Sequence, residues 1–428
     1  MRSIVFLLAS CATINAATLN TVVNWAVHNS PLIKQAEADL KLADLKRKSS
    51  KVARYGELNL VGDITHYNTE RTLAPLPPSA MKSPTPITTT KNIYSIGLSY
   101  SVPLFTGFAQ TRDIEIAQIA KSLSSIKIKL TKEEIAYNVK SLYLTILSLE
   151  EILKAQKRYT SALYRFKRVI KAQVKYGKKA EIDILKVEQD IENSKINQEL
   201  TKSNIEIAKA SLDAIVGKKV THLAPIKIRV KRARYSINSL VNKASSLSKV
   251  KAEDLTIAKS TKQIQKANAA NYPQIALNAY AGRNYGSNIH TDKSDHENIL
   301  QIGIHMQYNL VDFGKRNLQI EQAKVAKLKA KIKRKQTVLN VKKLIVEAVS
   351  KIKVSYQEYL GNSASLRVAR KAANIEEVRY QNGVSTINDL LLAKAQEELA
   401  NAKRIESKYR YQKSKYYLDY VIERGVKQ

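Results

Sequence analysis

Residues 93–120 read IYSIGLSYSVPLFTGFAQTRDIEIAQIA, and residues 299–326 follow the same pattern as ILQIGIHMQYNLVDFGKRNLQIEQAKVA. The two stretches align without a gap at an offset of 206 residues, and Gly97 and Gly303 are one of several identical pairs. Each copy begins with period-2 alternation and changes to helical periodicity after a turn. The stretch therefore predicts a strand that runs into a long helix, and the chain contains this arrangement twice.

The strand part of each copy has one apolar face and one face of small or polar residues. The apolar positions are Tyr94, Ile96, Leu98, Tyr100, Val102 and Leu104 in the first copy, and Leu300, Ile302, Ile304, Met306, Tyr308 and Leu310 in the second. One interpretation is an ordinary half-buried strand with its apolar side on a core. The other is a strand of a transmembrane barrel, which needs about 11 residues to cross a bilayer. Periodicity alone leaves both open.

The chain has 428 residues and a formal net charge of +35, because 72 Lys and Arg residues stand against 37 acidic ones. Such a charge suggests that the protein binds a nucleic acid or an anionic surface. Alternatively, it reflects a lysine-rich proteome and has no specific functional meaning. The basic residues are mostly lysines spread over the whole length, without an arginine-rich patch that contains interleaved aromatic residues. We therefore expect no nucleic-acid partner.

Residues 1–16 are typical of a secretory signal peptide, with Arg2, an apolar core over residues 4–9 and a cleavage site after Ala16. The only cysteine, Cys11, lies inside it. Residues 8–11 also resemble a lipoprotein box, which would leave Cys11 acylated. We favour cleavage after Ala16, which gives an exported protein without thiol chemistry. The sequence has no later run of about 18 apolar residues and predicts no membrane-spanning helix.

The remaining pattern divides the chain into two repeats, residues 17–217 and 236–428, joined by a linker over 218–235. The first repeat predicts an interrupted helix over 20–54, a strand over 58–68, an exposed proline-rich loop over 69–92, the strand quoted above, and two long helices joined at Gly177. The second predicts one helix over 237–270, a strand over 275–284, a loop over 286–298, the second quoted strand, and long helices broken at Gly361-Asn362 and at Gly383.

Four strands of barrel length cannot close a barrel, and open sheet edges are not tolerated in lipid. A barrel must then be shared by several chains, and eight or twelve strands correspond to a dimer or a trimer. The helix predicted over 108–174 would be roughly 100 Å long, several times the thickness of a membrane. We therefore predict an α+β membrane protein in which the barrel continues into a coiled-coil tube of helices.

These features resemble the TolC-like outer membrane efflux protein family, and the resemblance covers residues 18–428. It rests on Pro103-Leu104-Phe105-Thr106-Gly107 and Leu310-Val311-Asp312-Phe313-Gly314 at the two strand-to-helix turns, where Pro103, Gly107 and Gly314 stand out. The pattern Tyr380-x-x-Gly383-x-Ser385-x-x-x-Asp389-Leu390 adds to it. Each motif is weak alone, but the duplicated order at constant spacing is specific.

The resemblance implies a homotrimer with a twelve-stranded barrel in the outer membrane, four strands from each chain, and a helical tunnel in the periplasm. It further implies docking to a periplasmic adaptor, or membrane fusion protein, and to an inner-membrane RND or ABC transporter. The function would be that of a passive conduit in a tripartite efflux pump or a type I secretion system. A periplasmic coiled-coil scaffold that does not conduct is the alternative.

Members of the family keep the periplasmic end of the tunnel closed with contacts among the helical tips. By position, Tyr380 matches the gating tyrosine, Asp183 its carboxylate partner and Asp389 a ring aspartate. Both aspartates have a simpler interpretation, since acids in the first turn of a helix compensate its N-terminal charge. We favour that interpretation for Asp183, and both remain open for Asp389.

This sequence departs from the family at three positions of the tips. Ser385 stands where some members have a gate arginine, Leu392 where a second ring aspartate occurs, and Val174 in place of the tyrosine of the first tip. We therefore expect a gate held by fewer charge contacts. The expected docking positions for the adaptor are Gly177, Lys178, Gly383 and Val384 at the ends of the hairpins.

The remaining motifs give no catalytic or cofactor site. Residues 290–296, HTDKSDH, contain metal-ligand residue types, but flexible polar loops show such residues by chance, and we predict no metal. The sequence offers no catalytic triad, phosphate-binding glycine loop or pair of catalytic carboxylates. We therefore expect a protein that is not an enzyme and uses no cofactor.

Overall fold

The computed structural model describes residues 16–79 and 87–426, so most of the predicted signal peptide, with Cys11, lies outside the described residues. The chain forms two compact units. The helical unit comprises Met1–Ala38, Ile126–Lys251 and Gln336–Gln428, and the sheet unit comprises Asp39–Ser125 and Ala252–Lys335. Each unit takes segments from both halves of the sequence. The two units are therefore groups of segments that pack together, and they do not correspond to the two sequence repeats. The division into repeats stays a prediction.

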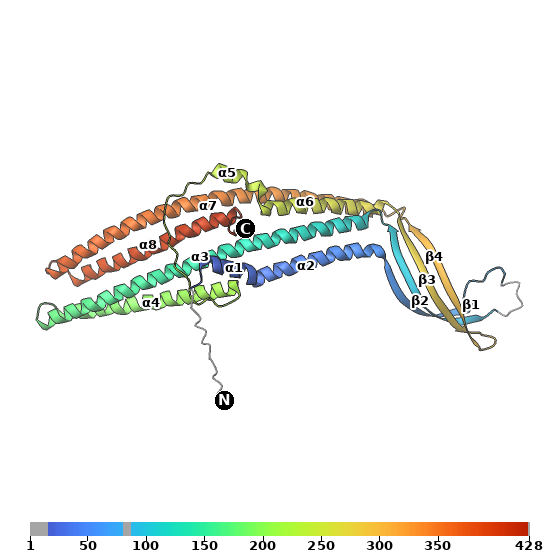
Figure 1. Ribbon diagram of the computed structural model, residues 1–428, viewed down its shortest axis with the longest axis horizontal. Coiled ribbons are helices and arrows are strands. Elements are labelled where there is room, and N and C mark those ends of the chain that lie inside the picture. The colour runs from blue at the N-terminus through green and yellow to red at the C-terminus, as the bar shows by residue number, and fades with distance from the viewer. Residues whose placement is uncertain (1–15, 80–86, 427–428) are drawn as a thin grey trace, which may run out of the picture. The chain divides into compact units, whose positions relative to one another are not determined.

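The sheet unit contains one antiparallel sheet with the strand order β1-β2-β3-β4 (Figure 1). The strands are β1 (Glu57–Thr72), β2 (Thr89–Phe105), β3 (Gln274–Ser287) and β4 (Ser294–Gln307). The pairing of β2 with β3 joins the two halves of the sequence, and β1 and β4 are the edges of the sheet in one chain. The predicted α+β class, with four strands in each chain, is confirmed.

The strands extend further into the predicted loops than expected. In the first half, β1 and β2 include residues from both ends of the predicted loop over 69–92. In the second half, β3 and β4 shorten the predicted loop over 286–298 to residues 288–293. The prolines lie between residues 75 and 86, whereas the flanks are rich in threonine, which favours strands. Leu73 is also buried, so this segment is not exposed throughout.

Pro103 lies inside β2 rather than after it. Proline cannot donate to a β-ladder, and the register between β2 and β3 shifts between Pro103 and Phe105. The pairing of β1 with β2 already ends at Ser101, so Pro103 has no partner on that side. In the second half, β4 ends at Gln307, and Tyr308 lies beyond the strand in which it was predicted.

Two long helical hairpins follow the strands, as predicted. They consist of α3 (Ala109–Lys175) with α4 (Glu181–Val216), and α7 (Lys315–Gln381) with α8 (Ile387–Val421). α3 and α7 contain 67 residues each, about 100 Å of helix. The predicted break at Gly361-Asn362 is wrong, because α7 continues through it. A glycine inside a helix costs only about 1 kcal/mol relative to alanine, and the surrounding helix tolerates that cost.

Shorter helices precede each pair of strands. They are α1 (Leu19–Asn29) and α2 (Pro31–Val52) in the first half, and α5 (Ile237–Asn242) and α6 (Ser248–Ala267) in the second. The prediction of one helix over 237–270 is wrong, since the chain breaks before Ser248. The backbone N–H groups of Ser248 and Lys249 donate to the carboxylate of Glu423, at 2.8 and 3.1 Å. Glu423 thus satisfies the free donors at the start of α6.

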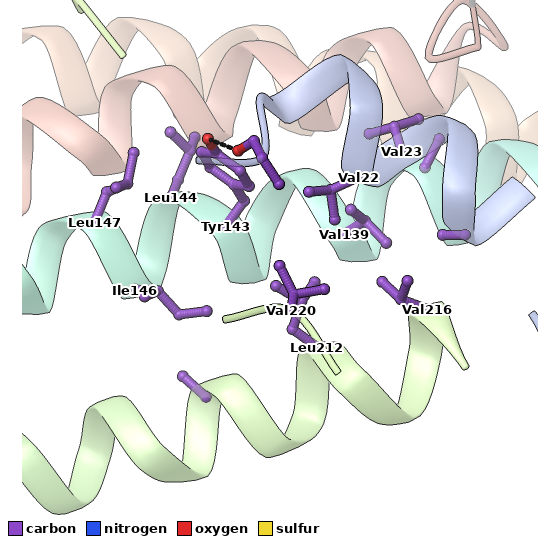
Figure 2. Close-up of a cluster of buried hydrophobic side chains, with 14 of the residues drawn as sticks. Val22, Val23, Val139, Tyr143, Leu144, Ile146, Leu147, Leu212, Val216 and Val220 are labelled. Atoms are coloured by element: carbon purple, nitrogen blue, oxygen red, sulfur yellow. Dashed lines mark hydrogen bonds between the residues drawn. The ribbon is translucent and has the colours of Figure 1, made fainter. Parts of the chain in front are cut away.

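The main core of the helical unit gathers around α3. Figure 2 shows Tyr143 and Val139 of α3 among side chains from α1 and from the end of α4, and all the labelled residues are buried. The hydroxyl of Tyr143 donates to the carbonyls of Ala17 and Ala224, at 3.0 and 2.6 Å. One side chain therefore fixes the start of the described chain and the linker to α3. A second cluster joins α7, α8 and α5 around Tyr411 and Ile345.

Candidate functional site

The two helical hairpins turn through glycines with the same geometry. Gly177 and Gly383 have φ values of 71° and 76°, in the left-handed region that favours glycine. After each helix the chain makes the paired backbone bonds of a Schellman motif: Gly177 N–H donates to Val174 and Lys178 N–H to Gln173, both at 2.9 Å. In the second tip, Gly383 and Val384 donate to Tyr380 and Arg379. Lys178 and Val384 are both exposed.

The structure brings together Tyr380 at the end of α7 and Asp183 in the first turn of α4. The hydroxyl of Tyr380 donates to Asp183 Oδ2 at 2.9 Å, and the tyrosine is only 3% exposed. Lys179 Nζ lies 3.9 Å from the ring centroid and donates to the Tyr380 carbonyl at 3.1 Å. Phe166 of α3 packs edge-on against the same ring, at 5.8 Å between centroids. These contacts tie the second hairpin to the first.

Electrostatics keep the Tyr380 hydroxyl protonated and available as a donor. Burial raises the pKa of Tyr380 well above its usual value, and the carboxylate of Asp183 raises it further. A core of apolar side chains underlies the contact. Its buried members are Leu163, Ile170, Val187, Ile191, Tyr380, Ile387, Leu390 and Leu391. The tip is therefore a packed apolar interface, and Tyr380 forms polar bonds with Asp183 and Lys179 at its edge.

Asp389 takes part in a cap at the start of α8. Its Oδ2 accepts from the backbone N–H and the hydroxyl of Thr386, at 3.0 and 2.7 Å, while its own N–H donates to Thr386 Oγ1 at 3.2 Å. This reciprocal arrangement is a capping box. The hydroxyl of Thr386 and then its N–H lower the pKa of Asp389. Within one chain, the helix-compensating interpretation therefore accounts for the contacts of Asp389.

Two other positions of the second tip lie close to this cap. Leu392 is exposed, and Ser385 is half-buried. The buried hydroxyl of Ser385 has no hydrogen-bond partner among the residues that the structure describes. Position 385 holds no arginine, and the hydrogen bonds of Tyr380 with Asp183 and with Lys179 join the two tips.

Sequence reasoning missed a group of acidic side chains between α4 and α8. Burial raises the pKa of Asp190 on α4. It also raises the pKa of Glu398 on α8, and the charge of Asp190 contributes as the second cause. Tyr159 of α3 lies close to both acids, and its pKa is raised by burial and then by Asp190. Its buried hydroxyl has no partner within the described part of the chain. Single acidic residues are common in helical sequence, so nothing in the sequence indicated that these side chains would lie close together.

Replacing Glu398 by glutamine is expected to change how stability depends on pH. The folded-state pKa of Glu398 lies above its unfolded value, so folding binds a proton and the stability decreases as pH rises through the folded pKa. Glu398→Gln should therefore unfold at a higher temperature than the wild type at pH 7.5, and at the same temperature at pH 4. Thermal unfolding followed by circular dichroism measures both, with the exposed Glu206→Gln on α4 as the control. An equal gain at the two pH values would contradict the assignment.

The strand-to-helix turns place their glycines in the left-handed region. Gly107 has a φ of 61°, and a Cβ there would lie 2.4 Å from the carbonyl oxygen of Ala269, so only glycine fits. Gly314 has a φ of 88° in open space. Its N–H donates at 3.1 Å to Asp312, which also accepts from the N–H of Arg316 at 2.9 Å. Each turn thus ends the strand and starts the helix.

The structure describes the histidine-rich hairpin loop of the second half. His290 Nε2 lies 3.6 Å from Glu70 Oε2, and the Asn288 side chain accepts from the backbone of His290 at 2.9 Å. Over residues 16–79 and 87–426, no group of three or more His, Cys, Asp or Glu side chains is arranged to hold a metal ion. None of the helices in these ranges is both long and apolar enough to cross a membrane.

The fold combines two long helical hairpins with a four-stranded antiparallel sheet. Comparison with known sequences identifies the family of proteins to which this chain belongs. The chain belongs to the outer membrane efflux protein family, whose sequence pattern matches residues 22–218 and 244–420. The matched residues make up most of both halves. The protein is therefore an outer-membrane protein of a family of channels rather than an enzyme. A comparison with curated proteins returned no significant match.

Solved structures share the fold at low sequence identity. The outer membrane protein VceC of Vibrio cholerae has a TM-score of 0.75 at 16% identity, with 95% of this chain and 96% of that chain covered. The CmeC outer membrane channel of Campylobacter jejuni has a TM-score of 0.76 at 15% identity, covering 95% and 86%. The MtrE outer membrane channel of Neisseria gonorrhoeae, in its open state, has a TM-score of 0.75 at 14% identity, covering 95% and 89%.

Proposed function

We propose that three copies of this chain form the outer-membrane exit channel of a tripartite efflux pump or a type I secretion system. Four strands from each copy would complete a closed barrel, and the helical hairpins would form a periplasmic tunnel. The channel would be a passive conduit that a periplasmic adaptor connects to an inner-membrane RND or ABC transporter. Membership of the outer membrane efflux protein family supports the channel, and the faces of the sheet support its assembly.

The observation that carries the proposal is the apolar face of the sheet. The register aligns apolar residues of all four strands on one side, and most of those on β1, β2 and β4 are exposed in the single chain. Leu60 of β1 is 73% exposed, and Leu300 and Ile302 of β4 are 84% and 73% exposed. A water-exposed apolar surface of this kind marks a binding or membrane surface. Lipid would cover it in the assembled channel.

The opposite face of the sheet suits a water-filled interior. It carries Asp63 and Ser95, which are neighbours across β1 and β2, and Tyr280 and Gln301, which are neighbours across β3 and β4. Among the described residues of one chain, the edge strands β1 and β4 lack a second neighbouring strand. Because unpaired edges are not tolerated in lipid, β1 of one copy would pair with β4 of the next.

We assign the gate to the tips of the helical hairpins. The bond between Tyr380 and Asp183 supports a closed state, because it joins the end of α7 to the start of α4. In a trimer, three copies of Asp389 would add negative charge at the entrance, beyond their capping role. Exposed Lys178 and Val384, next to Gly177 and Gly383, would meet the adaptor.

Removing the hydroxyl of Tyr380 is expected to open the channel. A hydrogen bond to a charged group contributes about 1.5–3 kcal/mol, so its loss in Tyr380→Phe should raise the open population about tenfold or more. Single-channel recordings in planar bilayers measure the open population, with Tyr176→Phe as the control, because Tyr176 lies in the first tip and is exposed. Equal open populations of Tyr380→Phe and the wild type would contradict the gate. A membrane-inserted wild type that never conducts would contradict the channel and favour the scaffold.

A further inference from the structure

The segment between the two helical hairpins is unusually basic. Residues 223–235 read LAPIKIRVKRARY, and we call them the basic strap. The sequence contains no acidic residue between Asp213 and Glu253, while the strap alone carries five cationic side chains. These are Lys227, Arg229, Lys231, Arg232 and Arg234. The charge of the strap is therefore not balanced by its own neighbours in the sequence.

The strap is an extended segment held against helices of the helical unit. Leu223 forms a parallel bridge with Ala17, and the carbonyl of Ala224 accepts from Tyr143 on α3 at 2.6 Å. Further along, the carbonyl of Lys231 accepts from Tyr411 on α8. Figure 1 shows this segment running as irregular chain from α4 toward α5. Buried tyrosines therefore anchor the backbone of the strap at Ala224 and at Lys231.

Over residues 226–231, alternate residues of the strap face opposite ways. Ile226, Ile228 and Val230 are half-buried and pack on the two hydrophobic clusters of the helical unit. The residues between them, Lys227 and Arg229, are exposed, and the remaining three cations of the strap are exposed as well. Alternate residues of extended chain lie about 6.6–6.8 Å apart, which sets the spacing of the first three cations.

Both the side chains and the backbone of the strap are available to a partner. None of the five cationic side chains forms an ion pair or hydrogen bond with another residue of the described ranges. From Ile226 to Tyr235, no backbone N–H donates to another described residue. Unpaired donors along an extended segment are a template on which a second strand can pair.

The far end of the strap borders a cavity of about 300 Å³. Arg232, Arg234 and Lys353 supply its positive charge, and Tyr235 and Tyr356 add aromatic rings. Ile237, Val349 and Ile352 also line it. The cavity is therefore suited to one side chain that is both acidic and partly apolar, at the end of a bound segment.

We propose that the basic strap is a docking site for an extended acidic peptide segment of another protein, which binds by strand addition. Asp or Glu residues at alternate positions would lie opposite Lys227, Arg229 and Lys231, and the free N–H groups of the strap would pair with the peptide backbone. The period of two in the first three cations and the unpaired backbone favour a peptide over a carboxylate-bearing glycan, which offers no matching strand.

The test uses the full-length protein in detergent or lipid nanodiscs at physiological salt. A fluorescein-labelled peptide with four Asp residues alternating with Thr is compared with a second peptide in which the same four Asp residues form a block. The alternating peptide should bind more tightly, because only its acids match the spacing of the strap. Fluorescence anisotropy gives both Kd values, and polygalacturonate serves as the glycan probe.

Two matched variants locate the binding site. The triple substitution Lys227→Glu/Arg229→Glu/Lys231→Glu should weaken binding of the alternating peptide by roughly tenfold or more, since three attractive contacts become repulsive. Lys329→Glu/Lys331→Glu/Lys333→Glu makes a comparable charge change at exposed positions of α7 and should leave the Kd unchanged. The proposal is overturned by equal Kd values for the two peptides, by equal losses in the two variants, or by binding of polygalacturonate alone.

Discussion

Ile302→Lys is expected to prevent assembly of the protein in the outer membrane. Ile302 lies on the apolar face of the edge strand β4, and lysine at the middle of a bilayer costs about 2–4 kcal/mol on the lipid face of a barrel strand. In a trimer this cost occurs three times. The measurement is the amount of trimer in the outer-membrane fraction, seen as heat-modifiable migration on a gel. The variant should be depleted from that fraction, while the wild type is present.

The matched control is Gln301→Lys, one residue earlier. Successive residues of a strand point to opposite faces, so this lysine would face the water-filled interior and should be tolerated. Equal depletion of both variants would indicate general misfolding rather than a lipid-facing side chain. Normal assembly of both variants would contradict the membrane assignment of the apolar face.

Tyr143→Ala is expected to destabilise the helical unit by about 3–5 kcal/mol, because it removes a fully buried aromatic side chain and leaves a cavity. Tyr143→Phe keeps the ring and should cost only about 1–3 kcal/mol, since two carbonyls lose their donor. The single tryptophan of the chain, Trp25, packs on this same cluster and reports its unfolding. Its fluorescence in a urea titration measures the free energy of unfolding.

The exposed Tyr176→Ala at the first tip is the control for these two variants, and its unfolding should match that of the wild type. A loss for Tyr143→Phe as large as that for Tyr143→Ala would mean that the hydroxyl, not the ring, holds the cluster. No loss in either variant would contradict the role of Tyr143 as the anchor of the linker.

Much of the fold follows from local pattern. The faces of β2 and β4 were predictable because strand side chains alternate with a period of two, and Leu98 and Ile302 lie on the same apolar face in the structure. The hairpin turns were predictable because Gly177 and Gly383 interrupt otherwise continuous helical sequence. Where local signals were weak the prediction was wrong: Gly361 sits inside α7, and the segment before Ser248 breaks because Glu423, 175 residues later, caps α6.

The candidate site depended on contacts that local pattern does not encode. Tyr380 and Asp183 are 197 residues apart in the sequence. Only the family resemblance indicated that they form a pair, because no periodicity of the sequence connects them. Asp389, by contrast, bonds to Thr386 three residues away, an arrangement that capping rules describe. The acids Asp190 and Glu398 come together only because α4 and α8 pack in the folded chain. Burial determines their pKa values, and burial is a property of the tertiary structure.

The position of β1 and β4 at opposite edges of one sheet has a consequence for how the sequence evolves. If neighbouring copies close the ring, residues of β1 touch residues of β4 from another subunit, although within one chain three strand spacings separate them. Substitutions at an edge position such as Leu60 should then covary across homologues with substitutions on β4, as substitutions at neighbouring positions do. Such paired changes would record the contact between subunits in the sequences themselves.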